Sequence, residues 1–161
     1  MSTHIRVRPT ALIVKEDSIL LVEYSDEHGL HYNLPGGGAE PGETVIDGVK
    51  REVWEETMAE VDVGRLALVY EYAPHRQSGD YASPTHTINL IFECRLKEGS
   101  EPRTPDQPDP SQTAVRWMRL DELDSIVLYP NIKQHIRQYL QGKPETEFIE
   151  DHQLESCSSA R

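Results

Sequence analysis

The stretch that decides the fold is LPGGGAEPGETVIDGVKREVWEETMA, residues 34–59. Pro35 and the glycines at 36–38 are incompatible with regular structure, so they predict a loop. Thr44 carries a hydroxyl that can cap a helix N-terminus, and from Val45 onward apolar residues recur with helical spacing. The stretch therefore predicts a glycine-rich loop followed by a helix over residues 45–58.

The predicted helix has an apolar face and an acidic face. The apolar residues recur every three or four positions, at Ile46, Val49 and Val53. Three carboxylates share a different face, at Glu52, Glu55 and Glu56. Like charges at this spacing destabilise a helix by a few tenths of a kcal/mol per pair. A hard divalent cation reverses that sign, because Mg²⁺ or Mn²⁺ prefers oxygen ligands and binds between carboxylates and substrate phosphates. A solvated acidic face is the alternative interpretation.

The same residues resemble the signature of the Nudix hydrolase family. That signature is a glycine, five residues, a glutamate, seven residues, and then Arg-Glu-aliphatic-any-Glu-Glu-any-Gly-aliphatic. The residues in register with it are Gly37, Glu43, Arg51, Glu52, Val53, Glu55, Glu56 and Ala59. Met58 departs from it, because the signature has glycine there. Methionine does not share the left-handed freedom of glycine, so we expect the helix to end by another route and to run on to Ala59 or Glu60.

The resemblance implies an α+β protein with the Nudix fold, a mixed β-sheet sandwiched between helices in an α/β/α arrangement. It also implies Mg²⁺ or Mn²⁺ as the cofactor. The metal ligands implied are Glu52, Glu55, Glu56 and the backbone carbonyl of Gly37. Arg51 and Glu43 are expected to form an ion pair that braces the loop against the helix. The reaction implied is attack of water on a phosphorus of a diphosphate linkage, assisted by metal ions that neutralise phosphate charge and activate water.

A carboxylate must accept the proton of the attacking water. The family places this base variably, and the sequence leaves several possibilities open. Glu56 can serve from the helix itself, beside Glu55 and Arg51. Glu93 and Glu71 lie on predicted strands and could face the site, although solvent exposure explains each equally well. Glu40, in the loop, is either a supporting group or a plain surface residue.

Several side chains could contact the phosphates or the base of a nucleotide substrate, although ordinary packing or exposure is the simpler interpretation of each. They are His75, Arg76, His86, Tyr32, Tyr72 and Tyr81.

The substrate expected from the resemblance is a nucleoside diphosphate linked to another moiety. Family members that cleave ADP-ribose tend to carry a proline about fifteen positions after the signature, and Pro74 follows Ala59 at that distance, 74 − 59 = 15. An ADP-ribose-like substrate is therefore the first hypothesis, although Pro74 also simply ends a strand. Nucleoside triphosphates and dinucleoside polyphosphates are alternatives. A non-catalytic nucleotide-sensing module is disfavoured because no signature glutamate is lost, and nothing supports isoprenoid diphosphate isomerisation.

The chain has 161 residues and a formal net charge of −12 at pH 7. This length suits one domain, placed at residues 1–142, followed by an acidic tail at residues 143–161. Nucleic acids and anionic membranes bind through Lys and Arg, so the charge argues against both partners. Cys94 lies in an apolar run and Cys157 in a polar tail, without a disulfide framework or a secretory signal, which predicts a cytoplasmic protein. The resemblance also favours a homodimer.

Apolar runs predict strands over residues 5–14, 19–24, 30–34, 61–63, 65–73, 87–96 and 114–120, the first two forming a hairpin. Residues 98–111 contain four prolines and predict a long irregular loop. Pro130 is expected in the first turn of a helix that Gly142 ends. The polar tail is expected to contribute little to the core, with Phe148 and Ile149 as its anchors.

Overall fold

The computed structural model describes residues 4–76, 79, 83–142 and 145–155. Its strands are β1 (Arg6–Lys15), β2 (Ser18–Asp26), β3 (Gly29–Asn33), β4 (Val61–Tyr72), β5 (Thr87–Leu96), β6 (Gln112–Arg119) and β7 (Glu147–Glu150). Its helices are α1 (Val45–Thr57) and α2 (Lys133–Gln141), with short 3₁₀ helices η1 (Leu120–Ser125) and η2 (Asp151–Gln153).

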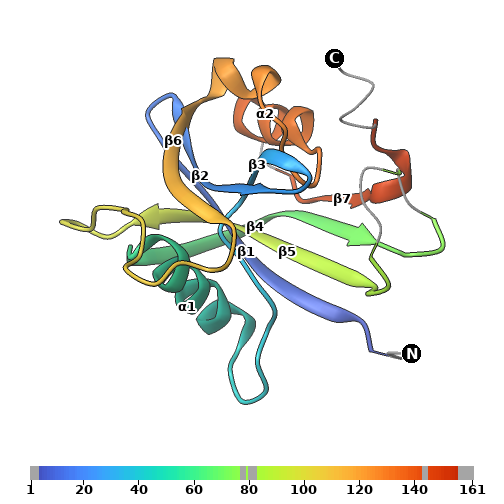
Figure 1. The fold of residues 1–161 in the computed structure, drawn as a ribbon, viewed down its shortest axis with the longest axis horizontal. Coiled ribbons are helices and arrows are strands. Elements are labelled where there is room, and N and C mark those ends of the chain that lie inside the picture. Colours follow the sequence, from blue (N-terminus) through green and yellow to red (C-terminus); the bar gives the residue numbers. More distant parts are fainter. Residues whose placement is uncertain (1–3, 77–78, 80–82, 143–144, 156–161) are drawn as a thin grey trace.

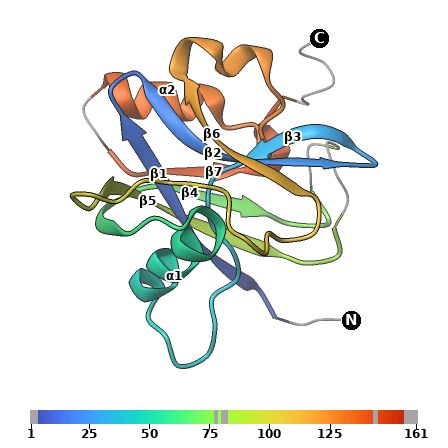
Figure 2. The ribbon, with the colours of Figure 1, turned by 60° about the vertical axis from the view of Figure 1, so that its left-hand side comes forward.

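The β-sheet is organised around β1. Its strands follow the order β3-β2-β1-β5-β4-β7, and β6 pairs with β2. β1 runs parallel to β5 along most of its length, but it pairs with β2 only at the hairpin end, through Val14 with Ile19 and Lys15 with Ser18. The predicted hairpin of β1 and β2 is therefore confirmed. At this hairpin the sheet divides into two arms, which diverge from each other. Figures 1 and 2 show α1 and α2 on opposite sides of the strands, as the predicted sandwich requires.

Two hydrophobic cores occupy the two faces of the β1-β5-β4-β7 arm. Side chains alternate between the faces of a strand, and β1 follows this rule. Ala11 and Ile13 pack toward α1, with Val49 and Val53. Leu12 packs on the other face in a separate cluster, whose members from α2 and the turn before it are Ile132, Ile136 and Tyr139. Because β1 contributes to both cores, it fixes the position of each helix relative to the sheet.

The N-terminal part of α1 agrees with the sequence. The Thr44 hydroxyl accepts a hydrogen bond from the Asp47 backbone N–H at 3.1 Å, so Thr44 is the N-cap. Val49 and Val53 are buried, whereas Ile46 remains exposed. The apolar face is thus narrower than predicted. The buried thiol predicted at Cys94 is also confirmed, and burial raises the pKa of Cys94 to about 12. Cys157 lies outside the described residues.

The end of α1 differs from the prediction. Met58 adopts the left-handed conformation, with φ 58° and ψ 19°, and its N–H donates to the Trp54 carbonyl at 2.9 Å. The expectation that the helix runs on to Ala59 or Glu60 is therefore wrong. The long loop before β6 and the first residue of β6 supply further donors to this terminus. The Arg103 N–H reaches the Thr57 carbonyl at 2.7 Å and the Gln112 side-chain amide reaches the Glu56 carbonyl at 3.0 Å.

The second helix begins later than expected. Pro130 precedes α2 instead of occupying its first turn, because the helix begins at Lys133 with Ile132 as its N-cap residue. Gly142 ends it, as predicted. No helix within the described ranges is both long enough and apolar enough to cross a membrane.

The tail contributes to the core, contrary to expectation. β7 lies beyond the boundary placed at residue 142 and pairs in parallel with β4. Ile149 is only 3% exposed, and the Tyr70 hydroxyl donates to the Asp151 carboxylate at 2.6 Å. Phe148 points to the other face of the strand and is 56% exposed. Of the two expected anchors, Ile149 is confirmed, whereas Phe148 is not an anchor on this domain.

Replacing Met58 with glycine tests the cost of the left-handed helix end. A side chain disfavours this backbone conformation, so we expect Met58→Gly to raise the free energy of unfolding by about 0.5–1 kcal/mol, measured in urea. The matched control is Lys50→Gly in the exposed interior of α1, which should lower that free energy by about 1 kcal/mol. Destabilisation by both substitutions would contradict the assigned conformation of Met58.

The contribution of the tail can be measured with two neighbouring substitutions. Ile149→Ala leaves a cavity in the core and should lower the free energy of unfolding by about 2–4 kcal/mol. Phe148→Ala removes an exposed side chain and should change that free energy by no more than about 0.5 kcal/mol in the monomer. Equal effects of the two substitutions would show that the tail does not pack as described.

Candidate active site at the glycine loop

Arg51 holds the glycine loop against α1. Its Nε and Nη2 atoms donate to the two carboxylate oxygens of Glu43 at 2.9 and 2.8 Å, and Nη2 also donates to the Gly38 carbonyl at 3.1 Å. The predicted ion pair is therefore present, with the two-pronged geometry that suits a guanidinium. Arg51, together with the Glu40 backbone N–H, lowers the pKa of Glu43 to about 2.

The same arginine binds two of the helix carboxylates. Its Nη1 atom lies 2.7 Å from Glu52 and 3.2 Å from Glu55. Glu40 approaches it more loosely, at 3.6 Å. Arg51 therefore offsets part of the repulsion along the acidic face and connects it to the loop. Glu52 is largely buried, whereas the side chain of Glu55 is 53% exposed.

Glu56 is the most deeply buried carboxylate on this face, with only 2% of the residue exposed. One oxygen accepts the Gly36 N–H at 2.7 Å, and the other accepts the Tyr24 hydroxyl at 2.8 Å. Burial raises the pKa of Glu56 to about 7, although both hydrogen bonds oppose this shift. Both donors are neutral, so the site suits a cation next to Glu56.

Two glycines of the loop lie in close contact with charged side chains. A Cβ atom at Gly37 would overlap the Glu52 carboxylate, and one at Gly38 would overlap the Arg6 guanidinium. Glycine at both positions therefore lets these two charged groups lie directly against the loop backbone. The loop consequently lies between an acidic helix and a basic part of β1.

The metal-binding prediction rests on the chemistry of these donors. In the described part of the chain, no three His, Cys, Asp or Glu side chains are already gathered as a metal site. All the predicted ligands are nevertheless oxygen atoms, which Mg²⁺ and Mn²⁺ prefer. The Glu52 carboxylate lies against Gly37, and Glu56 binds the adjacent Gly36. The donor set therefore fits a hard divalent cation between helix and loop.

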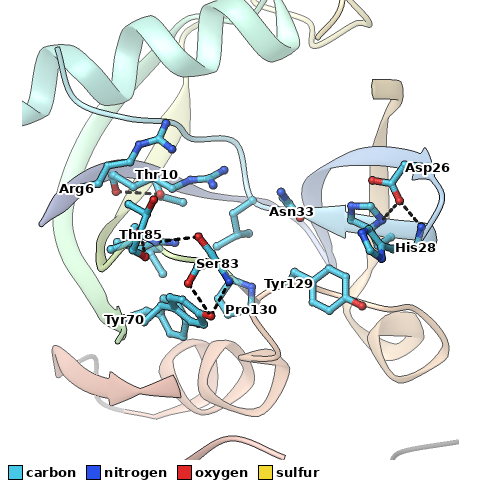
Figure 3. Close-up of a pocket in the computed structure, with 17 residues that line it drawn as sticks. Arg6, Thr10, Asp26, His28, Asn33, Tyr70, Ser83, Thr85, Tyr129 and Pro130 are labelled. Carbon is cyan, nitrogen blue, oxygen red and sulfur yellow. Dashed lines mark hydrogen bonds and ion pairs between the residues drawn. The ribbon is translucent and has the colours of Figure 1, made fainter. Parts of the chain in front are cut away.

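A cavity of about 550 Å³ opens beside the glycine loop. The Arg8 guanidinium, which lines it, donates to the Gly36 carbonyl at 3.0 Å. Figure 3 shows Arg6, Thr10 and Thr85 on one side, and Asp26 and His28 on the opposite side. This volume lies in the range of pockets that bind ligands the size of a nucleotide.

An aromatic row connects Glu56 with the wall of the cavity. The Tyr24 ring stacks on His31, with centroids 5.6 Å apart and planes inclined by 15°. His31 in turn contacts Tyr129 at 5.3 Å. His31 and Tyr129 line the cavity. Sequence analysis did not find Tyr24, because its contact with Glu56 spans 32 residues and depends on how β2 packs against α1.

Sequence analysis also missed the two arginines of β1. Arg6 and Arg8 alternate with Val7 and Pro9, and this alternation was a signal that both arginines share one face. Asn33 was missed as well, although it lines the cavity with a buried Oδ1 atom that has no hydrogen-bond partner among the described residues.

The strand glutamates are not gathered with Glu56. Glu93 lies on the face of β5 toward α2, where its carboxylate accepts the Tyr139 hydroxyl at 2.6 Å. Glu71 lies 2.9 Å from His86 Nε2. Because α1 covers the opposite face of the β5 arm, Glu93 and Glu56 are separated by the sheet.

The predicted substrate contacts are divided among different places. Tyr72 lines the large cavity. His75, Arg76 and His86 line a separate pocket of about 130 Å³ near Glu71. Tyr32 lines neither space, and its hydroxyl donates to the Glu23 carboxylate at 2.7 Å. Tyr81 lies outside the described residues.

The raised pKa of Glu56 predicts how stability depends on pH in the presence of EDTA. Between the ordinary value of 4.5 and the folded value of about 7, the folded state binds more protons than the unfolded state. The free energy of unfolding should therefore fall as pH rises through this window, by on the order of 2–3 kcal/mol. Urea unfolding at pH 5 and pH 8 measures the change.

Glu56→Gln should remove most of this dependence, whereas the exposed control Glu98→Gln should retain it. The lowered pKa of Glu43 acts in a different window, because its stabilising effect is lost only as pH falls from 4.5 toward about 2. An unchanged slope in Glu56→Gln between pH 5 and pH 8 would contradict the assignment.

Comparisons with known proteins agree with this geometry. The family model of the NUDIX domain matches residues 4–141. A MutT-like protein of Streptomyces ambofaciens is 35% identical over 73% of this chain and 66% of its own length. Nucleoside triphosphatase NudI of Escherichia coli is 32% identical over 52% of this chain and 63% of its own length. The crystal structure of an ADP-ribose pyrophosphatase from Streptococcus suis is 26% identical, with a TM-score of 0.65 over 90% of this chain and 99% of that one.

The matched segments span just under two thirds of the two curated relatives. The family model, in contrast, covers strands β1 to β6, helices α1 and α2, and the whole glycine-loop site. The chain therefore belongs to the Nudix family.

Proposed function

We propose that the chain is a metal-dependent pyrophosphohydrolase that cleaves a nucleoside diphosphate linked to another moiety. The observation that carries this proposal is the buried Glu56 carboxylate, held against the glycine loop beside a cavity of about 550 Å³. A hydrolase needs oxygen ligands for a metal and a pocket for the nucleotide, and both adjoin Gly36 here. The family membership supports the same reaction class.

Each carboxylate has a role in the proposal. Glu52, Glu55, Glu56 and the Gly37 carbonyl would hold Mg²⁺ or Mn²⁺. The metal, when bound, supplies phosphate charge neutralisation and an activated water. Arg51 positions Glu52 and Glu55 through its Nη1 atom, at 2.7 and 3.2 Å. Glu56 is the proposed proton acceptor, because its buried carboxylate belongs to the same helix face as the proposed ligands Glu52 and Glu55. Glu93 has no role in this proposal, because it lies across the sheet.

Two substrate classes remain candidates. The position of Pro74 supports an ADP-ribose-like substrate, and the Streptococcus suis neighbour is described as an ADP-ribose pyrophosphatase. A nucleoside triphosphate is supported by the likeness to NudI, which is described as a nucleoside triphosphatase. A panel of both classes, with released phosphate measured after phosphatase treatment, separates them.

The remaining predictions concern the oligomeric state, the cellular location and the partners of the protein. A homodimer stays a prediction, and the exposed Phe148 offers one apolar contact for a second copy. A cytoplasmic location, without nucleic-acid or membrane partners, also stays a prediction.

Conservative substitution of the ligands tests the function. Glu55→Gln and Glu56→Gln keep the size of the side chain but remove a charge that a hard cation needs. We expect turnover of the preferred substrate to fall by at least about 100-fold in each variant, while circular dichroism stays unchanged. The matched control is Glu60→Gln, an exposed glutamate just beyond α1, which should keep wild-type turnover.

Metal binding provides a second readout. Mg²⁺ or Mn²⁺ should raise the Tm of the wild type, because it binds the folded state, and should raise it less in the two variants. In EDTA near neutral pH, Glu56→Gln should be at least as stable as the wild type, since the burial of charge is relieved. Wild-type turnover together with an unchanged metal-dependent Tm shift in both variants would rule out the metal site.

A further inference from the structure

Two arginines of β1 face the cavity beside the glycine loop. Arg6 and Arg8 are two positions apart on one strand, so their side chains share a face. Arg6 is exposed at the end of the strand and lies against Gly38, whereas Arg8 is half-buried and binds the Gly36 carbonyl. The basic side of the cavity therefore adjoins the loop that Glu52 and Glu56 contact from the other side.

These arginines have unused hydrogen-bonding capacity. The Nε atom of Arg8 is buried and has no hydrogen-bond partner within the described ranges. Neither Arg6 nor Arg8 belongs to any ion pair formed among the described residues. Buried donors and charges are normally satisfied, and a chain with a net charge of −12 has many carboxylates available. The two guanidinium groups therefore keep N–H donors that no described residue engages.

We propose that Arg6 and Arg8 form an anion-binding subsite that takes a substrate phosphate on the cavity side of the glycine loop. A guanidinium presents planar, paired donors that match the oxygens of a phosphate. Thr10 and Thr85 line the same side of the cavity (Figure 3), where the Thr10 hydroxyl donates to the Arg8 carbonyl at 3.2 Å. Asp26 lies on the opposite side of the cavity from Arg6 (Figure 3).

The subsite differs from the metal site in its charge. Gly36 connects the two, because its N–H binds Glu56 and its carbonyl binds Arg8. A phosphate can approach the acidic helix only together with a cation, whereas Arg6 and Arg8 can bind one without metal. Arg8 also lowers the pKa of Glu52 and Glu56 electrostatically, although burial has a larger and opposite effect on each. The positive charge of Arg8 therefore acts electrostatically on the carboxylates of α1 from the cavity side of the loop.

This inference rests on the proposed function, because it assumes that a nucleotide occupies the cavity. The subsite also predicts a preference among substrates. A substrate that carries a third phosphate, in addition to the two joined by the bond that is cleaved, can contact both the metal and the arginines. A nucleoside triphosphate meets this requirement, whereas ADP-ribose carries only the two phosphates of its linkage. Arg6 and Arg8 are therefore expected to determine specificity for the longer phosphate chain.

Binding measured in EDTA tests the subsite without turnover. We would titrate the full chain with ATP, AMP and adenosine by calorimetry. Arg6→Gln and Arg8→Gln should each weaken ATP binding by about tenfold, leave adenosine binding unchanged and reduce the salt dependence of ATP binding. The matched control is Arg95→Gln, an exposed arginine of β5 outside the cavity lining, which should bind all three probes like the wild type.

The outcomes separate the subsite from the proposed function. Wild-type ATP affinity in both cavity variants, an equal loss of ATP and adenosine binding, or no ATP binding by the wild type would overturn the subsite. Arg6 is exposed, so Arg6→Gln remains informative if Arg8→Gln does not fold. Arginine-dependent ATP binding without hydrolysis of any nucleotide in Mg²⁺ would support the subsite and refute the proposed hydrolase. Hydrolysis of a nucleotide in Mg²⁺, together with wild-type ATP binding by both arginine variants, would refute the subsite and support the proposed hydrolase.

Discussion

The burial of the Glu56 carboxylate constrains the whole site. A carboxylate that is almost fully buried needs hydrogen-bond donors for both oxygens, and these come from distant parts of the chain, Gly36 and Tyr24. These two contacts fix α1 against the glycine loop and against β2. The arrangement keeps a charge-bearing group inside the protein, which raises its pKa and makes the site receptive to a cation.

The glycine loop separates two regions of opposite charge. On the helix side, Arg51 ties Glu43 and the acidic face to the loop. On the cavity side, Arg6 and Arg8 contact the same loop from β1. Glycine permits this double contact, because a side chain at either of two loop positions would overlap a charged group. The loop backbone is thus the boundary at which a phosphorylated ligand could meet both a cation held by carboxylates and the guanidinium groups.

The long loop before β6 has a structural role that supports the site. Its backbone and the Gln112 side chain bind carbonyls at the C-terminal end of α1, directly beside Glu56. This end of the helix carries the unfavourable Met58 conformation, so donors from outside the helix satisfy carbonyls that further helical turns would otherwise satisfy. The proline-rich segment is therefore anchored to the end of α1, although most of its residues are exposed.

The sequence by itself determined the features that depend on local spacing. The glycine loop and the helix after Thr44 could be predicted from spacing, because their residues lie within one short stretch. The Arg51–Glu43 pair followed from the family resemblance of that same stretch. Tertiary structure alone decided which distant side chains join them. Tyr24 and Arg8 reach the site through sheet packing, whereas Glu93 is carried to the opposite face. Pairing with β4 likewise decided that Ile149 is buried and Phe148 exposed. The physical reason is that periodicity along a chain defines the faces of an element, but only the packing of elements defines what each face meets.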